Sequence, residues 1–99
     1  MENIVIDFAN VKSTYEFHQT LIEPLELEKP TRGMYAGYKY AENFDALWDL
    51  LYCSFYEETT ITLRNFNSLR KKLPETTKIA KKVFDDLQKE DEYVTIRYE

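Results

Sequence analysis

The chain has 99 residues, of which 43% are hydrophobic and 15% aromatic, and its formal net charge is −5. That apolar fraction is enough to bury a core, which excludes a disordered chain, and the length fits a single domain over residues 1–99. The sequence contains no apolar run long enough to predict a membrane span. It shows no signal-peptide pattern, and its lone cysteine, Cys53, has no partner for an internal disulfide. We therefore expect a cytoplasmic protein.

The charges are segregated along the chain. Residues 40–63 contain five acidic residues and no Lys or Arg, whereas residues 64–82 contain seven basic residues and one acidic residue. Residues 85–92 are again acidic, with five acids and one lysine. Overall acidity argues against general nucleic-acid binding, which needs a basic surface. It favours a basic protein as the partner.

A strand is predicted first, at residues 3–8, where apolar residues alternate. A helix follows, because Ser13 and Glu16 have the spacing of a capping box. We expect this helix to end at about Glu23, since Pro24 disfavours a helical conformation in the residue before it.

Residues 24–41 are rich in Pro, Gly and Tyr, and they predict a long loop of a kind that is often functional. A second helix is predicted at about residues 43–56. One face of it is apolar and holds Phe44, Leu47, Trp48, Leu51 and Phe55. Three acids are expected on nearly the opposite face, at positions i, i+3 and i+7: Glu42, Asp45 and Asp49.

The remaining elements alternate between strand and helix. Residues 60–63 predict a strand, and residues 65–72 a short helix that Pro74 ends. A longer helix is predicted at residues 75–90 and a last strand at residues 93–98. On the longer helix, five residues are expected to face the core: Ile79, Ala80, Val83, Phe84 and Leu87.

Strands that are separated by helices imply parallel pairing through right-handed crossovers. All three strands alternate between apolar and polar residues, which predicts that only one face of the sheet is well buried. We therefore predict a two-layer α/β fold, in which about four helices pack on a three-stranded parallel sheet.

The acidic helix face has two interpretations. It is a row of anions matched to a cationic groove, or it is an ordinary solvated helix face. The helix macrodipole accounts for acids in the first turn but not for Asp49, which lies in the middle of the helix. Asp86 and Glu90 oppose the macrodipole near the end of the last helix and form a like-charge i, i+4 pair. They indicate either a partner or a solvated helix end.

Carboxylates also raise the hypothesis of a metal-assisted hydrolase that uses Glu42, Asp45 and Asp49. The one histidine, His18, is far from them in sequence and is expected at the surface or at the core boundary. No phosphate-binding glycine loop, Cys/His metal pattern or nucleophile elbow is present. We therefore predict a protein that is not an enzyme and needs no cofactor or metal. The basic stretch at residues 70–82 is interpreted as a solvated surface, because aromatics do not interleave it.

The segment from Tyr40 to Leu51 reads Tyr-Ala-Glu-Asn-Phe-Asp-Ala-Leu-Trp-Asp-Leu-Leu. It closely resembles the signature of the barstar family, in which Tyr-Gly-Glu-Asn leads into Leu-Asp-Ala-Leu-Trp-Asp. Residues 18–21 and the spacing from residues 83–84 to residues 94–96 match as well, so the resemblance covers nearly the whole chain except residues 24–39. The resemblance implies a tight inhibitor of a small extracellular ribonuclease, kept in the cytosol of the producing cell.

In that family the second helix and the loop before it enter the nuclease cleft, and the position of Asp49 places a carboxylate where the substrate phosphate would lie. The partner-binding residues that we predict are Asp49, Asp45, Asn43, Trp48, Tyr52, Asp86, Glu90, Glu42, Tyr40 and Tyr38. We expect a free monomer that binds one small basic ribonuclease, or another basic protein, in a 1:1 complex, with no nucleic acid and no membrane as partner. The alternative is a barstar-fold adaptor whose partner is a non-ribonuclease protein or a toxin.

The chain departs from the family pattern at Ala41, where the family has glycine, and at Lys39, where a tyrosine is usual. Alanine restricts the freedom of the backbone there. A lysine is repelled by a cationic cleft, which weakens binding to the usual nuclease. Both departures therefore affect which partner the protein binds.

Overall fold

The structure, a computed structural model, describes residues 1–27, 40–52 and 54–99. Three residues discussed above lie outside the described residues: Tyr38, predicted to bind the partner, Lys39, which departs from the family pattern, and Cys53. The elements in chain order are β1 (Glu2–Asp7), α1 (Thr14–Leu25), α2 (Phe44–Leu51), β2 (Thr59–Arg64), α3 (Phe66–Lys72), α4 (Pro74–Glu90) and β3 (Val94–Tyr98).

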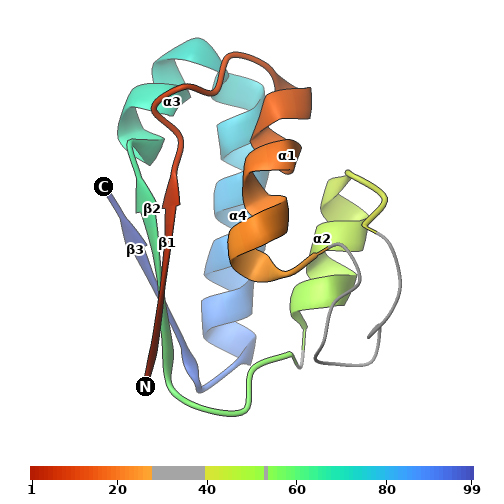
Figure 1. The fold of residues 1–99 in the computed structure, drawn as a ribbon, viewed down its shortest axis with the longest axis vertical. Helices are drawn as coiled ribbons and strands as arrows, with labels where there is room; N and C mark the ends of the chain where they lie inside the picture. The colour runs from red at the N-terminus through yellow and green to blue at the C-terminus, as the bar shows by residue number, and fades with distance from the viewer. Residues whose placement is uncertain (28–39, 53) are drawn as a thin grey trace.

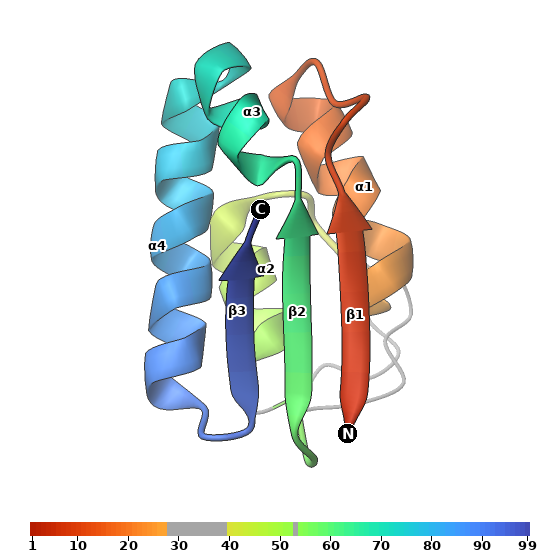
Figure 2. The same ribbon diagram turned by 90° about the vertical axis from the view of Figure 1, so that its left-hand side faces the viewer.

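The three strands form one parallel sheet in the order β1-β2-β3, with Ile61 of β2 paired to Ile4 on one side and to Ile96 on the other. Figure 2 looks onto this sheet: α1, α2 and α4 lie behind it, and α3 lies beyond the upper ends of the strands. Burial alternates accordingly along β1, where Ile4 and Ile6 are buried and Val5 is exposed. The predicted parallel sheet, buried on one face, is confirmed.

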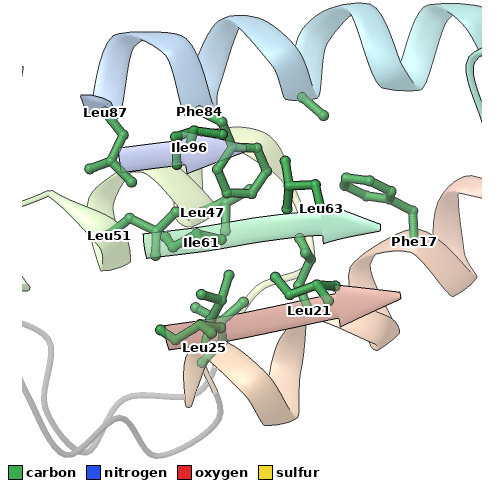
Figure 3. Close-up of a cluster of buried hydrophobic side chains, with 14 of the residues drawn as sticks. Phe17, Leu21, Leu25, Leu47, Leu51, Ile61, Leu63, Phe84, Leu87 and Ile96 are labelled. Carbon is green, nitrogen blue, oxygen red and sulfur yellow. The ribbon is translucent and has the colours of Figure 1, made fainter. Parts of the chain in front are cut away.

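The core lies between the sheet and the helices. Figure 3 shows side chains from β2, α1, α2 and α4 converging there, among them Ile61, Phe17, Leu47 and Phe84. Helix α2 lies farther from the sheet than α1 and α4 (Figure 1), and it reaches the core through Leu47 and Leu51, which are buried. Full burial of an aliphatic or aromatic side chain is worth about 1.5–3 kcal/mol. This apolar contact is therefore what holds α2 in place.

Helix α1 begins as predicted and ends later than predicted. The Oγ atom of Ser13 accepts a hydrogen bond of 3.1 Å from the backbone N–H of Glu16. The expected end at Glu23 is wrong, because the helix continues through Pro24 to Leu25. Proline so close to the end removes a single backbone donor. Burial of Leu25 in the core compensates for that loss.

Helix α2 ends at Leu51, five residues earlier than the expected residue 56. Tyr52 is already extended, with ψ at 127°, and the hydroxyl of Ser54 donates to the carbonyl oxygen of Leu50. Side chains of this kind compete with the next helical hydrogen bonds. Phe55 is still buried, as expected, but it reaches the core from an irregular segment that leads to β2.

Helix α4 begins with Pro74 in its first turn, where the missing N–H costs nothing. Ala80, Phe84 and Leu87 are buried as predicted. The expectation for Ile79 is wrong, because its side chain is 47% exposed. Helix α2 covers the neighbouring part of α4 incompletely, and Ile79 lines the open groove between the two helices.

Candidate partner-binding site

Helices α2 and α4 pack against each other, and an open groove of about 480 Å³ lies between their solvent-facing sides. Its carboxylates come from both helices: Asp45 and Asp49 from α2, and Asp86 from α4. Its apolar lining consists of Phe44, Trp48, Ile79 and Val83. We call this feature the acidic groove. The structure thus brings together two acidic segments that are almost forty residues apart in the sequence.

The charges in the acidic groove are poorly compensated. Asp45 and Asp49 are exposed, and neither forms an ion pair with any described residue. They are four residues apart on one helix, a spacing at which like charges repel. Asp86 differs from them, since Lys82 of the same helix lies 3.2 Å away as its ion-pair partner. The groove therefore presents two carboxylates that no described residue pairs, and both are open to a cation.

The N-terminus of α2 is capped by Asn43. Its Oδ1 atom accepts a hydrogen bond of 2.8 Å from the backbone N–H of Ala46. Because the helix occupies this oxygen, Asn43 orients α2, and its side-chain NH₂ is the group left for a partner. Asp45 lies in the first turn, where the macrodipole stabilises its negative charge.

Tyr40 is not on the surface. Its side chain is only 3% exposed, and its hydroxyl oxygen lies 2.5 Å from Nδ1 of His18 and 3.3 Å from the carbonyl oxygen of Asn43. These contacts connect α1 to the residue that caps α2. Tyr40 therefore supports the start of α2 from within the core, and its contact with a partner stays a prediction.

His18 is also buried, so the expectation of a surface or boundary position is wrong. The ring of Phe44 lies 4.8 Å from that of His18, centroid to centroid, and Phe17 contacts it edge-on. Burial lowers the pKa of His18, and the negative charge of Glu42 opposes this in part. Burial likewise raises the pKa of Tyr40 above its ordinary value. Both side chains are therefore held neutral near pH 7.

Glu42 does not belong to the row of acids on α2. It precedes the helix in a left-handed conformation, with φ at 58°, and its carboxylate accepts a hydrogen bond from the amide of Gln19 in α1. The expectation of three carboxylates on one helix face is therefore corrected to two. Ala41, at the position of the family's glycine, is not among the residues with positive φ. Alanine is thus compatible with this backbone.

Two more predicted residues lie beyond the acidic groove. Tyr52 follows the end of α2, and its ring packs on that of Trp48 with centroids 5.4 Å apart. Glu90, at the end of α4, lies with Tyr52 in a second groove. The structure thus separates the predicted residues into a central group and a group at the helix ends.

The sequence predicted that Lys82 relieves the negative charge near the end of α4, but not that it lies in the acidic groove, and it assigned Ile79 to the core. The spacing of Lys82 and Asp86, four residues apart on a helix, was a usable signal for an ion pair. No sequence signal shows that Ile79 borders α2, because that depends on how two helices pack.

Within residues 1–27, 40–52 and 54–99, no group of three or more His, Cys, Asp or Glu side chains is arranged to hold a metal ion. The hydrolase hypothesis therefore lacks a ligand set there, since Glu42 is turned towards α1. None of the described helices is long and apolar enough to cross a membrane.

A three-stranded parallel sheet with four helices, and exposed carboxylates between two of those helices, define a small α/β protein whose surface is suited to a basic partner. The chain belongs to the barstar family, since the family model described as Barstar (barnase inhibitor) matches residues 1–99. Proteins of this family are inhibitors and not enzymes, and membership implies binding of a barnase-like ribonuclease. No curated protein matches the chain.

Proposed function

We propose that this protein inhibits a small basic ribonuclease by placing the acidic groove in the nuclease cleft, in a 1:1 complex within the cytoplasm of the producing cell. The observation that carries the proposal is the pair of exposed carboxylates of Asp45 and Asp49, which have no ion-pair partner among the described residues, with Asp86 facing them across the groove. A ribonuclease needs cationic groups to hold phosphate and to stabilise developing charge. An aspartate offers similar charge without a bond that the enzyme can cleave.

Asp49 is the residue that we place closest to the nuclease's phosphate site. Unlike Asp45 it is away from the helix N-terminus, and unlike Asp86 it has no lysine beside it. Within the described part of the chain, the negative charge of Asp49 therefore neither stabilises a helix N-terminus nor forms an ion pair. Charge complementarity of this kind speeds encounter and fixes the register of binding.

The surface around Asp49 is preorganised. The Asn43 cap and the link from His18 through Tyr40 hold the beginning of α2 before any partner arrives. Leu47 and Leu51 anchor the helix in the core. Little ordering entropy then remains to be lost on binding, which favours high affinity.

The test is isothermal titration into a small basic ribonuclease at low and moderate salt, comparing the wild type, Asp49→Ala and the control Glu23→Ala. Glu23 is an exposed acid on α1, outside the acidic groove, so the control removes the same charge elsewhere. We expect Asp49→Ala to weaken binding at least about 30-fold, the effect of a hot spot worth about 2 kcal/mol. The barnase–barstar complex is itself a standard example of binding hot spots, so the expected loss of affinity is taken from the family.

Thermal unfolding of Asp49→Ala should remain close to that of the wild type, because exposed substitutions usually change stability by less than about 0.5 kcal/mol. The proposal is wrong if the wild type binds the ribonuclease neither at low nor at moderate salt. The placement of Asp49 is wrong if Asp49→Ala and Glu23→Ala weaken binding equally, or if Asp49→Ala unfolds several degrees earlier.

A second candidate is an adaptor whose basic partner is not a ribonuclease. Lys82 favours it, because an ammonium group in the acidic groove reduces complementarity to a uniformly cationic cleft. An RNA-cleavage assay separates the two candidates: an inhibitor abolishes cleavage at a 1:1 ratio, whereas an adaptor leaves cleavage unchanged.

A further inference from the structure

A second groove, of about 490 Å³, lies at the ends of α2 and α4 and contains Tyr52, Tyr56 and Tyr93. We call it the tyrosine groove. We infer that the partner-binding surface continues into it and that it holds an arginine side chain of the partner. The inference rests on the proposed function, which it extends from the acidic groove to a neighbouring surface.

Exposed aromatic side chains are concentrated in this groove. Tyr52, Tyr56 and Tyr93 are 47%, 73% and 41% exposed, and Phe55, which also lines the groove, is buried. Tyrosine is enriched at protein interfaces, where its ring supplies contact area and its hydroxyl a polar contact. A cluster of exposed rings therefore indicates a surface that a partner covers.

The charge around the tyrosine groove selects the chemistry of that partner. Glu90 and Glu92 are exposed at its edge and form no ion pair with any described residue. Asp91 accepts a hydrogen bond of 2.9 Å from the backbone N–H of Tyr93, and Lys89 is the only basic residue in the groove's described lining. The groove therefore combines aromatic rings with an excess of carboxylate, which suits a cation.

Arginine fits this combination better than lysine. A guanidinium group is planar, so it stacks on a tyrosine ring while it donates two parallel hydrogen bonds to one carboxylate. An ammonium group is compact and strongly hydrated, so it cannot stack flat on a ring or donate two parallel hydrogen bonds to one carboxylate. The three tyrosines, with Glu90 and Glu92 beside them, supply both kinds of contact.

The tyrosine groove is continuous with the acidic groove. The rings of Trp48 and Tyr52, which line one groove each, are packed against each other. On α4, Glu90 follows Asp86 by one helical turn. Figure 1 shows that α2 and α4 end at the same side of the molecule, where residues 54–58 run towards β2. A partner that covers Asp49 and Asp86 therefore has the tyrosine groove directly beside it.

The first experiment is isothermal titration of a small basic ribonuclease with the wild type, with the double variant Tyr56→Ala and Tyr93→Ala, and with Tyr15→Ala. Tyr15 is an exposed tyrosine on α1, outside both grooves. We expect the double variant to bind at least about tenfold more weakly, as for the loss of an aromatic anchor, and Tyr15→Ala within about twofold of the wild type. Thermal unfolding of each variant verifies that the fold is intact.

A second experiment tests the arginine directly and does not depend on a nuclease. Blocked tetra-arginine and tetra-lysine peptides are titrated into the full chain while the NMR signals of the Tyr56 and Tyr93 rings are followed. We expect larger ring shifts with arginine than with lysine, and loss of that difference when Glu90 and Glu92 are replaced by glutamine.

The outcomes separate the inference from the proposed function. If the wild type binds the ribonuclease and the double variant binds equally well, the tyrosine groove lies outside the interface and the inference fails alone. If the wild type does not bind but tetra-arginine shifts the rings selectively, the proposed function fails and the groove's preference for arginine stands. Equal shifts with both peptides, or none, overturn that preference.

Discussion

Lys82 is a single residue that changes the charge of the acidic groove. Its ammonium group is 3.2 Å from the carboxylate of Asp86, so it partly neutralises the acidic groove, and its positive charge faces any cationic partner. Exposed ion pairs contribute about 0–1 kcal/mol to stability. The main consequence of Lys82 is therefore expected in binding.

We predict that Lys82→Gln strengthens binding to a basic ribonuclease by up to about fivefold, because it removes like-charge repulsion worth about 1 kcal/mol. Titration calorimetry at low salt measures the change. Lys72→Gln, an equal loss of charge on α3, is the control and should change affinity less. Weaker binding of Lys82→Gln would show instead that the lysine contacts an acidic group of the partner.

His18 is expected to make stability depend on pH. Because burial holds its pKa below the ordinary value of 6.5, the unfolded chain takes up the proton more readily. The free energy of unfolding therefore falls as the pH drops below about 6.5, by at most about 1.4 kcal/mol per pH unit. Tyr40 and Glu42 face this ring: burial raises the pKa of Tyr40, so it stays neutral here, and the negative charge of Glu42 makes the effect smaller.

Urea unfolding of the wild type and of His18→Gln between about pH 7.5 and about pH 5.5 measures this dependence. The wild type should lose stability over this range, and the variant should lose less, although it is less stable at neutral pH. Parallel curves for the two proteins would exclude His18 as the titrating group.

At the level of elements, β3 is attached to α4 by more than apolar contact. The hydroxyl of Tyr98 donates a hydrogen bond of 2.6 Å to Asp85, and the ammonium group of Lys81 lies 2.7 Å from the same carboxylate and 4.8 Å from the Tyr98 ring centroid. Burial alone would raise the pKa of Asp85, but the hydrogen bonds from Lys81 and Tyr98 outweigh it and lower the pKa. This network closes the edge of the sheet on the last helix.

We predict that Tyr98→Phe lowers the free energy of unfolding by about 1–2 kcal/mol, because a hydrogen bond to a charged group is lost. Urea unfolding near neutral pH measures this value. Tyr93→Phe is the matched control, since its ring is exposed and its hydroxyl has no hydrogen-bond partner in the described chain. An equal loss in both variants would show that the network contributes nothing to stability.

For the whole molecule, the arrangement of charge matters more than its total. The net charge of −5 is modest, but the structure places Asp45, Asp49, Asp86 and Glu90 on adjoining grooves of one side. Such an anionic surface attracts a cationic partner over roughly one Debye length, which is about 10 Å at 0.1 M salt. Association with a basic ribonuclease should therefore be steered by charge.

We predict that the association rate constant falls at least about tenfold between about 20 mM and about 200 mM salt, with a much smaller change in the dissociation rate. Stopped-flow fluorescence measures both rates, because Trp48 lies in the acidic groove. The double variant Asp45→Asn and Asp49→Asn should show a shallower dependence on salt. A rate constant that is independent of salt would contradict steering.

The sequence by itself determined the elements and the chemistry on the helices. Alternation of apolar residues predicted three strands, periodicity predicted the helices, and the segment from Tyr40 to Leu51 identified the family, because these signals are local. The errors lie where local rules compete with packing. Burial of Leu25 carried α1 through Pro24, and the Ser54 hydroxyl helped to end α2 early.

Only the tertiary structure decided which side chains share a surface. Glu42 was grouped with Asp45 by its spacing, but a contact with Gln19 of α1 turns it away. Asp86 joins Asp49 because α4 packs beside α2, and Tyr93 joins Tyr56 because the chain returns to the sheet at the end of α4. The position of a side chain along one element depends on its neighbours in sequence, whereas its neighbours in space depend on how the elements pack.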